Sequence, residues 1–98
     1  MNILSKNKKN AEILREISNR IGKEYESKSY DELLMLDETV EHEIIENGIR
    51  VIYYAELYNK KENGDLCISI DFHSELPTFL GIKPTYQFKK RPDGAVYY

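Results

Sequence analysis

The first third of the chain alternates apolar and polar residues with the period of a helix. Between positions 10 and 25, apolar side chains recur at intervals of three or four, and charged or amide side chains fill the positions between them. The apolar positions are Ile13, Leu14, Ile17, Ile21 and Tyr25. This spacing places one apolar stripe along a helix. The pattern therefore predicts an amphipathic helix over about 10–25.

A second, shorter helix is indicated by a capping signal. Ser29 is followed three residues later by Glu32, and four apolar residues come directly after. In a capping box, the serine hydroxyl and the glutamate side chain satisfy backbone N–H groups that a helix start leaves unpaired. We therefore expect a short helix over about 30–36.

From Val40 onward the apolar period becomes two, which is typical of strands. Two Asn-Gly pairs, Asn47-Gly48 and Asn63-Gly64, favour two-residue hairpin turns, because both residues of such a turn need positive φ. The first turn pairs His42 with Tyr53, and the second pairs Leu57 with Ile70. The predicted strands cover about 40–46, 49–58 and 66–73.

Both turns, taken independently, place apolar residues on the same side of the sheet, which supports the register. That side holds Val40, His42, Ile44, Ile49, Val51, Tyr53, Ala55, Leu57, Leu66, Ile68, Ile70 and Phe72. A fourth strand is expected over 85–90 and a fifth over 95–98, joined by the Arg91-Pro92-Asp93-Gly94 turn.

Together the elements predict an α+β fold in one domain, 1–98, with the helices packed on a four- or five-stranded antiparallel meander over about 40–98. One helix lying across a curved meander resembles the cystatin-like arrangement. This resemblance concerns element order alone, since no sequence motif supports it.

Composition excludes several classes of protein. The 98 residues are 41% hydrophobic and 32% charged, which is ordinary for a globular chain. One cysteine, Cys67, cannot form an internal disulfide or a thiolate metal cluster. The N-terminal segment lacks the apolar core of a signal peptide, and no apolar run is long enough to span a membrane. We therefore expect a cytoplasmic protein, and no motif predicts a cofactor or a metal site.

Charge and aromatic content are distributed unevenly. The net charge is −3, but residues 31–58 carry eight acidic side chains against Arg50 alone, between two segments of net positive charge. Either these segments neutralise one another in the fold or the acidic middle is a partner surface. Eight of the 11 aromatic residues are tyrosines, whose side chains can be half buried and half hydrated.

The predicted register also defines a second side of the sheet, which carries candidate chemical groups. These are Glu41, Tyr54, Glu56, Asp71 and His73. The register puts Glu56 directly opposite Asp71, and such a like-charge pair destabilises a sheet unless it is neutralised. A lysine of the fourth strand such as Lys89, a partner protein, or a bound metal ion or substrate could supply the opposite charge.

Two single residues each have a chemical and a structural interpretation. His42 could act as a base in a cavity under the helix, or it could be a core-edge residue with an ordinary hydrogen bond. Cys67 is expected on the outward side, opposite Lys60, as a passive thiol, since no histidine accompanies it.

The leading hypothesis is a small non-enzymatic interaction protein that forms a homodimer. The expected contact surface joins the second side of the sheet to an apolar loop and contains Ile45, Ile52, Tyr54, Tyr58, Leu76, Phe79, Leu80 and Ile82. One alternative is a small hydrolase, proton-transfer enzyme or divalent-metal binder that uses Glu41, Tyr54, Glu56, Asp71 and His73. A weaker alternative is nucleic-acid binding by the basic and aromatic segment 86–91.

Overall fold

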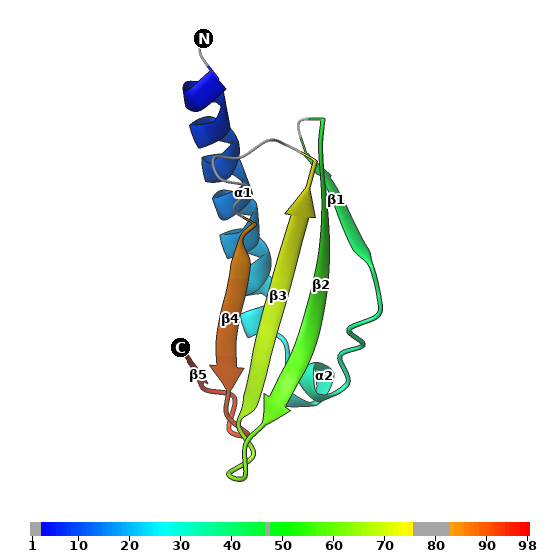
Figure 1. The fold of residues 1–98 in the computed structure, drawn as a ribbon. Helices are drawn as coiled ribbons and strands as arrows, with labels where there is room; N and C mark the ends of the chain where they lie inside the picture. The colour runs from blue at the N-terminus through cyan, green and yellow to red at the C-terminus, as the bar shows by residue number, and fades with distance from the viewer. Residues whose placement is uncertain (1–2, 47, 76–82) are drawn as a thin grey trace.

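Two helices precede five strands in the computed structural model, which describes residues 3–46, 48–75 and 83–98, with side chains from residue 9 onward (Figure 1). The elements are α1 (Ile3–Glu26), α2 (Tyr30–Leu34), β1 (His42–Glu46), β2 (Ile49–Lys60), β3 (Leu66–Ser74), β4 (Thr85–Lys90) and β5 (Val96–Tyr97). The strands form one antiparallel sheet in the order β1-β2-β3-β4-β5. The predicted α+β meander is thus confirmed, with five strands; the closer cystatin-like resemblance stays a prediction.

Helix α1 starts earlier than the apolar pattern indicated, at Ile3 instead of position 10, and ends at Glu26. Its predicted stripe is buried at Leu14, Ile17, Ile21 and Tyr25. These side chains join one hydrophobic core with residues from β2, β3 and β4. Burial of this stripe holds the helix on the sheet, since exposed helices gain little from propensity alone.

The capping box predicted for the second helix is present. Ser29 accepts a hydrogen bond from the Glu32 backbone N–H, and the Glu32 side chain accepts one from the Ser29 backbone N–H. The helix ends at Leu34, two residues sooner than expected, and Leu33 is its buried anchor.

Val40 does not belong to the apolar side, which corrects the prediction for the start of the first strand. The segment before β1 folds into a turn, in which the Val40 backbone N–H donates to the Asp37 carbonyl and Thr39 donates to the Asp37 side chain. This local bonding delays the strand until His42 and leaves Val40 exposed.

The first hairpin has the predicted register. His42 lies opposite Tyr53, Ile44 opposite Val51 and Glu46 opposite Ile49. The pairing follows from the two-residue turn, whose Gly48 has a positive φ of 77°.

The second hairpin does not have the predicted register, because its turn is longer than two residues. The Lys61 backbone N–H donates to the Asp65 carbonyl and the Gly64 N–H donates to the Lys61 carbonyl. Gly64 has a φ of 93°, which is in the left-handed region. A glycine in this conformation is typical of a three-residue hairpin loop. Leu57 consequently lies opposite Ile68, and Ala55 lies opposite Ile70 in place of the expected Phe72.

A bulge in β2 restores the predicted faces of the sheet. The register shifts by one residue between Leu57 and Asn59, in addition to the one-residue shift of the longer turn. Beyond the bulge, two shifts of one residue return the side chains to their predicted side, since side chains alternate with a period of two. Residues 59–61, between the bulge and the turn, are reversed. Apart from Val40, the apolar side was therefore predicted correctly although the pairs of the second hairpin were wrong.

The helices cover only one side of the sheet (Figure 1). We call the covered side the inner face and the side that points away from α1 the outer face. The inner face contributes Val51, Ala55, Ile68, Ile70, Phe72 and Phe88 to the core. Within the described part of the chain, no helix is both long enough and apolar enough to cross a membrane.

Gly22 sets how closely α1 approaches the sheet. A Cβ atom at this position would overlap three ring carbons of Tyr86 in β4. The phenol of Tyr86 donates a hydrogen bond to Glu26, one turn further along the helix, so the ring cannot turn away without losing that bond. Only a residue without a side chain fits between the helix axis and this ring.

We predict that Gly22→Ala destabilises the fold by about 1–3 kcal/mol, the usual cost of overpacking. The sign is informative, because glycine to alanine in an unobstructed helix stabilises by about 1 kcal/mol. Urea unfolding of the wild type, Gly22→Ala, Tyr86→Ala and the double variant measures the coupling. In the Tyr86→Ala background the alanine should become neutral or stabilising, and a stabilising effect in the wild-type background would contradict the contact.

Candidate functional site

The outer face carries large apolar and aromatic side chains that nothing in the described chain covers. Ile45 in β1 is 65% exposed and Tyr58 at the β2 bulge is 46% exposed, while Ile52 and Tyr54 are partly buried. These four residues are the sheet part of the predicted contact surface. The loop residues Leu76, Phe79, Leu80 and Ile82 of that prediction lie outside the described residues.

Four carboxylates of the outer face are connected through Glu56 and Tyr54, and we call them the acidic patch. They are Glu38, Glu41, Glu56 and Asp71. Glu41 accepts a hydrogen bond of 3.0 Å from the Tyr54 phenol, and Asp71 accepts one of 3.1 Å from the Thr85 hydroxyl.

The predicted direct opposition of Glu56 and Asp71 is wrong. The longer turn and the bulge place Ser69 opposite Glu56, and Tyr54 opposite Asp71. The two carboxylates still repel each other, but the nearest partner of Glu56 is Glu38. A hydrogen bond with Glu38 raises the pKa of Glu56, and partial burial and repulsion from Glu38 and Asp71 raise it further.

His73 lies beside this patch. Its ring meets the ring of Tyr54 edge-on, with 6.0 Å between centroids, and Ile52 lies opposite it in β2. It lines a cavity of about 160 Å³ whose walls include Arg50 and Glu75 but neither Asp71 nor Glu56.

The described residues contain no group of three or more His, Cys, Asp or Glu side chains placed to hold a metal ion. The fold brings Glu41, Tyr54 and His73 into one chain of contacts and Glu56 within electrostatic range of Asp71. Catalysis by these groups stays a prediction.

A second charged cluster occupies one end of the outer face, where the β2–β3 and β4–β5 turns lie, and we call it the basic end. Three cations surround the ring of Tyr97, at 5.6 Å for Lys61 Nζ, 5.5 Å for Lys89 Nζ and 5.1 Å for Arg91 Cζ from its centroid. The Tyr97 phenol donates to Asp65, the one carboxylate bonded to this ring within the described chain.

The charges of the two clusters do not meet. Lys89, expected to neutralise the acids, instead donates to the Tyr98 backbone carbonyl and lies over the Tyr97 ring. Among the described side chains, the ion pairs are Arg20–Glu46, Lys23–Glu26, Lys28–Glu32 and Arg50–Glu43. None of these pairs includes a residue of the acidic patch or the basic end.

Cys67 is on the outer face, as predicted, but it lies opposite Asn59 and Lys89 and not opposite Lys60. It is 2% exposed. A passive role for this buried thiol stays a prediction.

His42 stacks on the ring of Tyr53, with centroids 4.8 Å apart. It also lines a cavity of about 390 Å³ together with Tyr25, Leu36 and Val40. The predicted pairing with Tyr53 at the core edge is therefore confirmed, and a role as a base stays a prediction.

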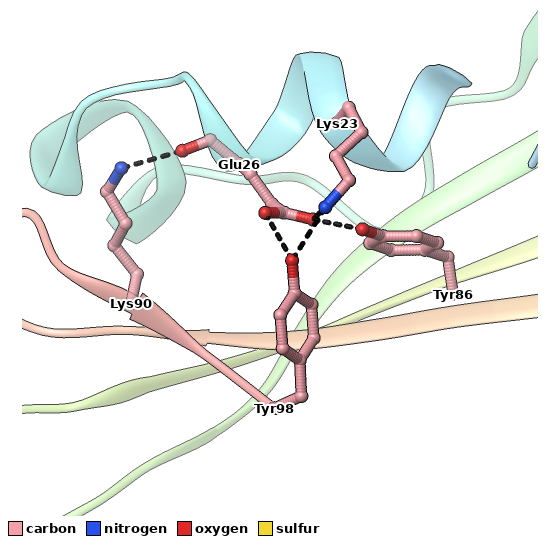
Figure 2. A network of polar contacts seen from close by, with 5 residues as sticks. All are labelled: Lys23, Glu26, Tyr86, Lys90 and Tyr98. Carbon is pink, nitrogen blue, oxygen red and sulfur yellow. Dashed lines mark hydrogen bonds and ion pairs between the residues drawn. The ribbon is translucent and has the colours of Figure 1, made fainter. Parts of the chain in front are cut away.

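The densest polar network of the described structure ties the C-terminal residues to the end of α1 (Figure 2). The Glu26 carboxylate accepts hydrogen bonds from the phenols of Tyr86 and Tyr98 and pairs with Lys23 at 3.4 Å. Lys90 donates to the Glu26 backbone carbonyl at 2.7 Å. A cation on the last carbonyl satisfies a helix end and its negative dipole.

Burial of Glu26 favours a higher pKa, but the hydrogen bonds from Tyr86 and Tyr98 and the charge of Lys23 together lower it. The Glu26 side chain is 12% exposed. Its hydrogen bonds reach Tyr86 in β4 and Tyr98 next to β5, so we assign this network to holding α1, β4 and β5 together.

Sequence patterns did not point to the Glu26 network or to the basic end. Both depend on contacts between residues more than 30 positions apart, such as Tyr97 with Asp65 and Tyr86 with Glu26. The one available signal was compositional, since the excess of tyrosine anticipated side chains that need a polar partner at one end.

Comparison of the chain with models of protein families, with curated proteins and with solved structures gave no match. The functional argument therefore depends on the geometry of the outer face.

We predict that Glu26→Gln lowers the free energy of unfolding by about 1–3 kcal/mol, since charge-assisted hydrogen bonds are lost in a nearly buried site. Because the folded pKa of Glu26 is below the unfolded value of 4.5, its contribution is complete above that pH and is lost as the pH falls through the folded pKa. Urea unfolding between neutral and acidic pH should show the two curves converging at low pH. Glu24→Gln, exposed on the same helix, is the control; a constant gap at all pH values would contradict the assignment.

We predict the opposite sign for Glu56→Gln, which should stabilise the monomeric chain by a few tenths of a kcal/mol at neutral pH. The folded pKa of Glu56 is raised, so its repulsion acts at high pH and disappears as the pH falls through that pKa. The gain from glutamine should therefore vanish in mild acid. Thermal unfolding of dilute protein measures it, with Glu62→Gln in the exposed turn as control, and a loss of stability at neutral pH would refute the account.

Proposed function

We propose that the protein is a small non-enzymatic interaction protein that forms a homodimer through the outer face of its sheet. The observation that carries this proposal is that Ile45 and Tyr58 are exposed, and Ile52 and Tyr54 only partly buried, on a sheet face that the described helices leave uncovered. Aromatic and large apolar side chains on such a face are enriched at protein contacts.

A second copy suits this face because the face carries both signs of charge outside the ion pairs of the described residues. The acidic patch needs cations and the basic end needs anions, and one copy of the chain offers both. A two-fold axis presents the same surface from each subunit, so each cluster can be used twice. We include a cytoplasmic location in the proposal, on the basis of the single, buried thiol of Cys67.

We predict that replacing both Tyr54 and Tyr58 with alanine raises the dimer dissociation constant by about tenfold or more, as loss of aromatic anchors commonly does. The substitution should leave the fold intact, because both side chains lie outside the core. Sedimentation equilibrium measures the association, and circular dichroism checks the fold.

Met35→Ala is the matched control, because Met35 is 81% exposed but lies after α2, away from the outer face. It should leave the dissociation constant unchanged. A wild-type chain that remains an 11.5 kDa monomer into the millimolar range would overturn the proposed dimer.

A further inference from the structure

The unpaired charges of the outer face are separated along the strands. On β3, Asp71 of the acidic patch lies four residues from Cys67, which is paired with Lys89 of the basic end. Four residues of strand correspond to about 13 Å. Over that distance between exposed charges, salt screens most of the attraction. Asp71 therefore gains little attraction from the cations of its own basic end.

Strand register shows that the two clusters share one face. Lys89 is paired with both Cys67 and Tyr97, so these side chains point the same way. Lys61 belongs to the same side, since its amine approaches the Tyr97 phenol at 3.4 Å. Glu56 lies opposite Ser69, two positions from Cys67 and therefore also on this side.

We infer that two copies pack outer face to outer face with their strands antiparallel, so that the acidic patch of each copy meets the basic end of the other. This inference depends on the proposed function and adds the arrangement of the partner. The two-fold axis runs across the strands at the level of Ile68, between Ser69 and Cys67. Tyr54 and Tyr58 then lie within the contact, whereas Ile45, seven strand positions from the axis, lies beyond the partner's β2–β3 turn. Rotation about this axis places Asp71 of one copy at the same height along the strands as Asp65 and the neighbouring Lys61 of the other copy.

The arrangement accounts for three features that the isolated chain leaves unexplained. Three cations are gathered around Tyr97 with a single carboxylate bonded to that ring. Glu38 and Asp71 repel Glu56, and none of the described ion pairs brings a cation to Glu38 or Glu56. Tyr58 is exposed between the two clusters, where the axis would bring it to the partner.

A parallel arrangement of the same faces is disfavoured by charge. It would place the acidic patch of one copy against that of the other, and the basic end against the basic end. Like charges brought together at an interface suppress association. The antiparallel order converts the same charges into two equivalent sets of attractive pairs, as two-fold symmetry requires.

Charge reversal at Glu56 and Lys61 tests whether the strands of the two copies run antiparallel. Glu56→Lys and Lys61→Glu should each raise the dimer dissociation constant by about tenfold or more, since every exchange makes two attractive contacts repulsive. The variant with both substitutions in one chain should recover association to within about threefold of the wild type. Sedimentation equilibrium at low and high salt gives the constants, and added salt should weaken the wild-type dimer.

Lys60→Glu is the matched control. Lys60 is an exposed neighbour of Lys61, but it faces the other side of the sheet, opposite the buried Leu66. It should leave the dissociation constant unchanged. Urea unfolding checks that each variant folds. Glu56→Lys also removes a repulsion within its own chain, so this variant is expected to fold. Should either reversed variant not fold, the pair Asp71→Lys and Arg91→Glu repeats the test.

The outcomes separate the two proposals. A wild-type dimer that tolerates both single reversals, or whose double variant is as weak as the singles, overturns the antiparallel order but not the interaction function. A monomeric wild type overturns both. A monomer that binds a single-stranded oligonucleotide through Lys61 also overturns both and favours nucleic-acid recognition at the basic end.

Discussion

A single helix can cover only one face of a sheet, and the rest of this structure depends on that constraint. The stripe of Leu14, Ile17 and Ile21 packs on the inner face, and the core of the described chain lies between these two layers. Close packing requires Gly22 under the ring of Tyr86. The same constraint leaves the opposite face of the sheet facing away from the helices, and Ile45 and Tyr58 are exposed there.

The tyrosines connect the two layers and the two faces. Tyr25 and Tyr53 meet in the inner layer, with ring centroids 6.2 Å apart. Tyr86 and Tyr98 bring their phenols to Glu26 at the helix end, as Figure 2 shows. Tyr97 gathers the cations of the basic end. The phenols of Tyr86, Tyr97 and Tyr98 each reach a carboxylate, which a phenylalanine could not do.

Tyr30 uses the same property to hold α2 against a turn. Its phenol donates to the Gly64 carbonyl at 2.5 Å, and Pro92 of the next turn lies beside that glycine. The turns 61–65 and 91–95 have the same pattern of backbone hydrogen bonds and a left-handed glycine at the same place. Lys61 and Arg91, the first residues of these two turns, both lie close to the ring of Tyr97.

Much of the fold could be predicted from local patterns, because burial imposes periods of 3.6 and 2 on α1 and on the strands. The Ser29 capping box and the first hairpin were confirmed for the same reason. The pairs of the second hairpin could not be predicted, since Asn63-Gly64 is compatible with two loop lengths and the bulge beside Leu57 has no sequence signal.

The candidate site was only partly accessible to sequence reasoning. Its face followed from alternation, which placed Tyr54, Glu56 and His73 together. Its charge contacts did not, because Glu38 reaches Glu56 from a turn outside the strands and Lys61 reaches Tyr97 from a different hairpin. Side chains brought together by loops carry no periodic signal.

The central claim is that the outer face is the contact surface between two copies. Two-dimensional NMR spectra of the uniformly ¹⁵N-labelled chain, recorded over a dilution series, test it residue by residue. The account predicts concentration-dependent shifts of the amides of Tyr54, Glu56, Tyr58 and Lys61, with no change around Leu14 and Ile17 under the sheet. Spectra that do not change with concentration, or shifts that centre on Met35 and Val40, would contradict it.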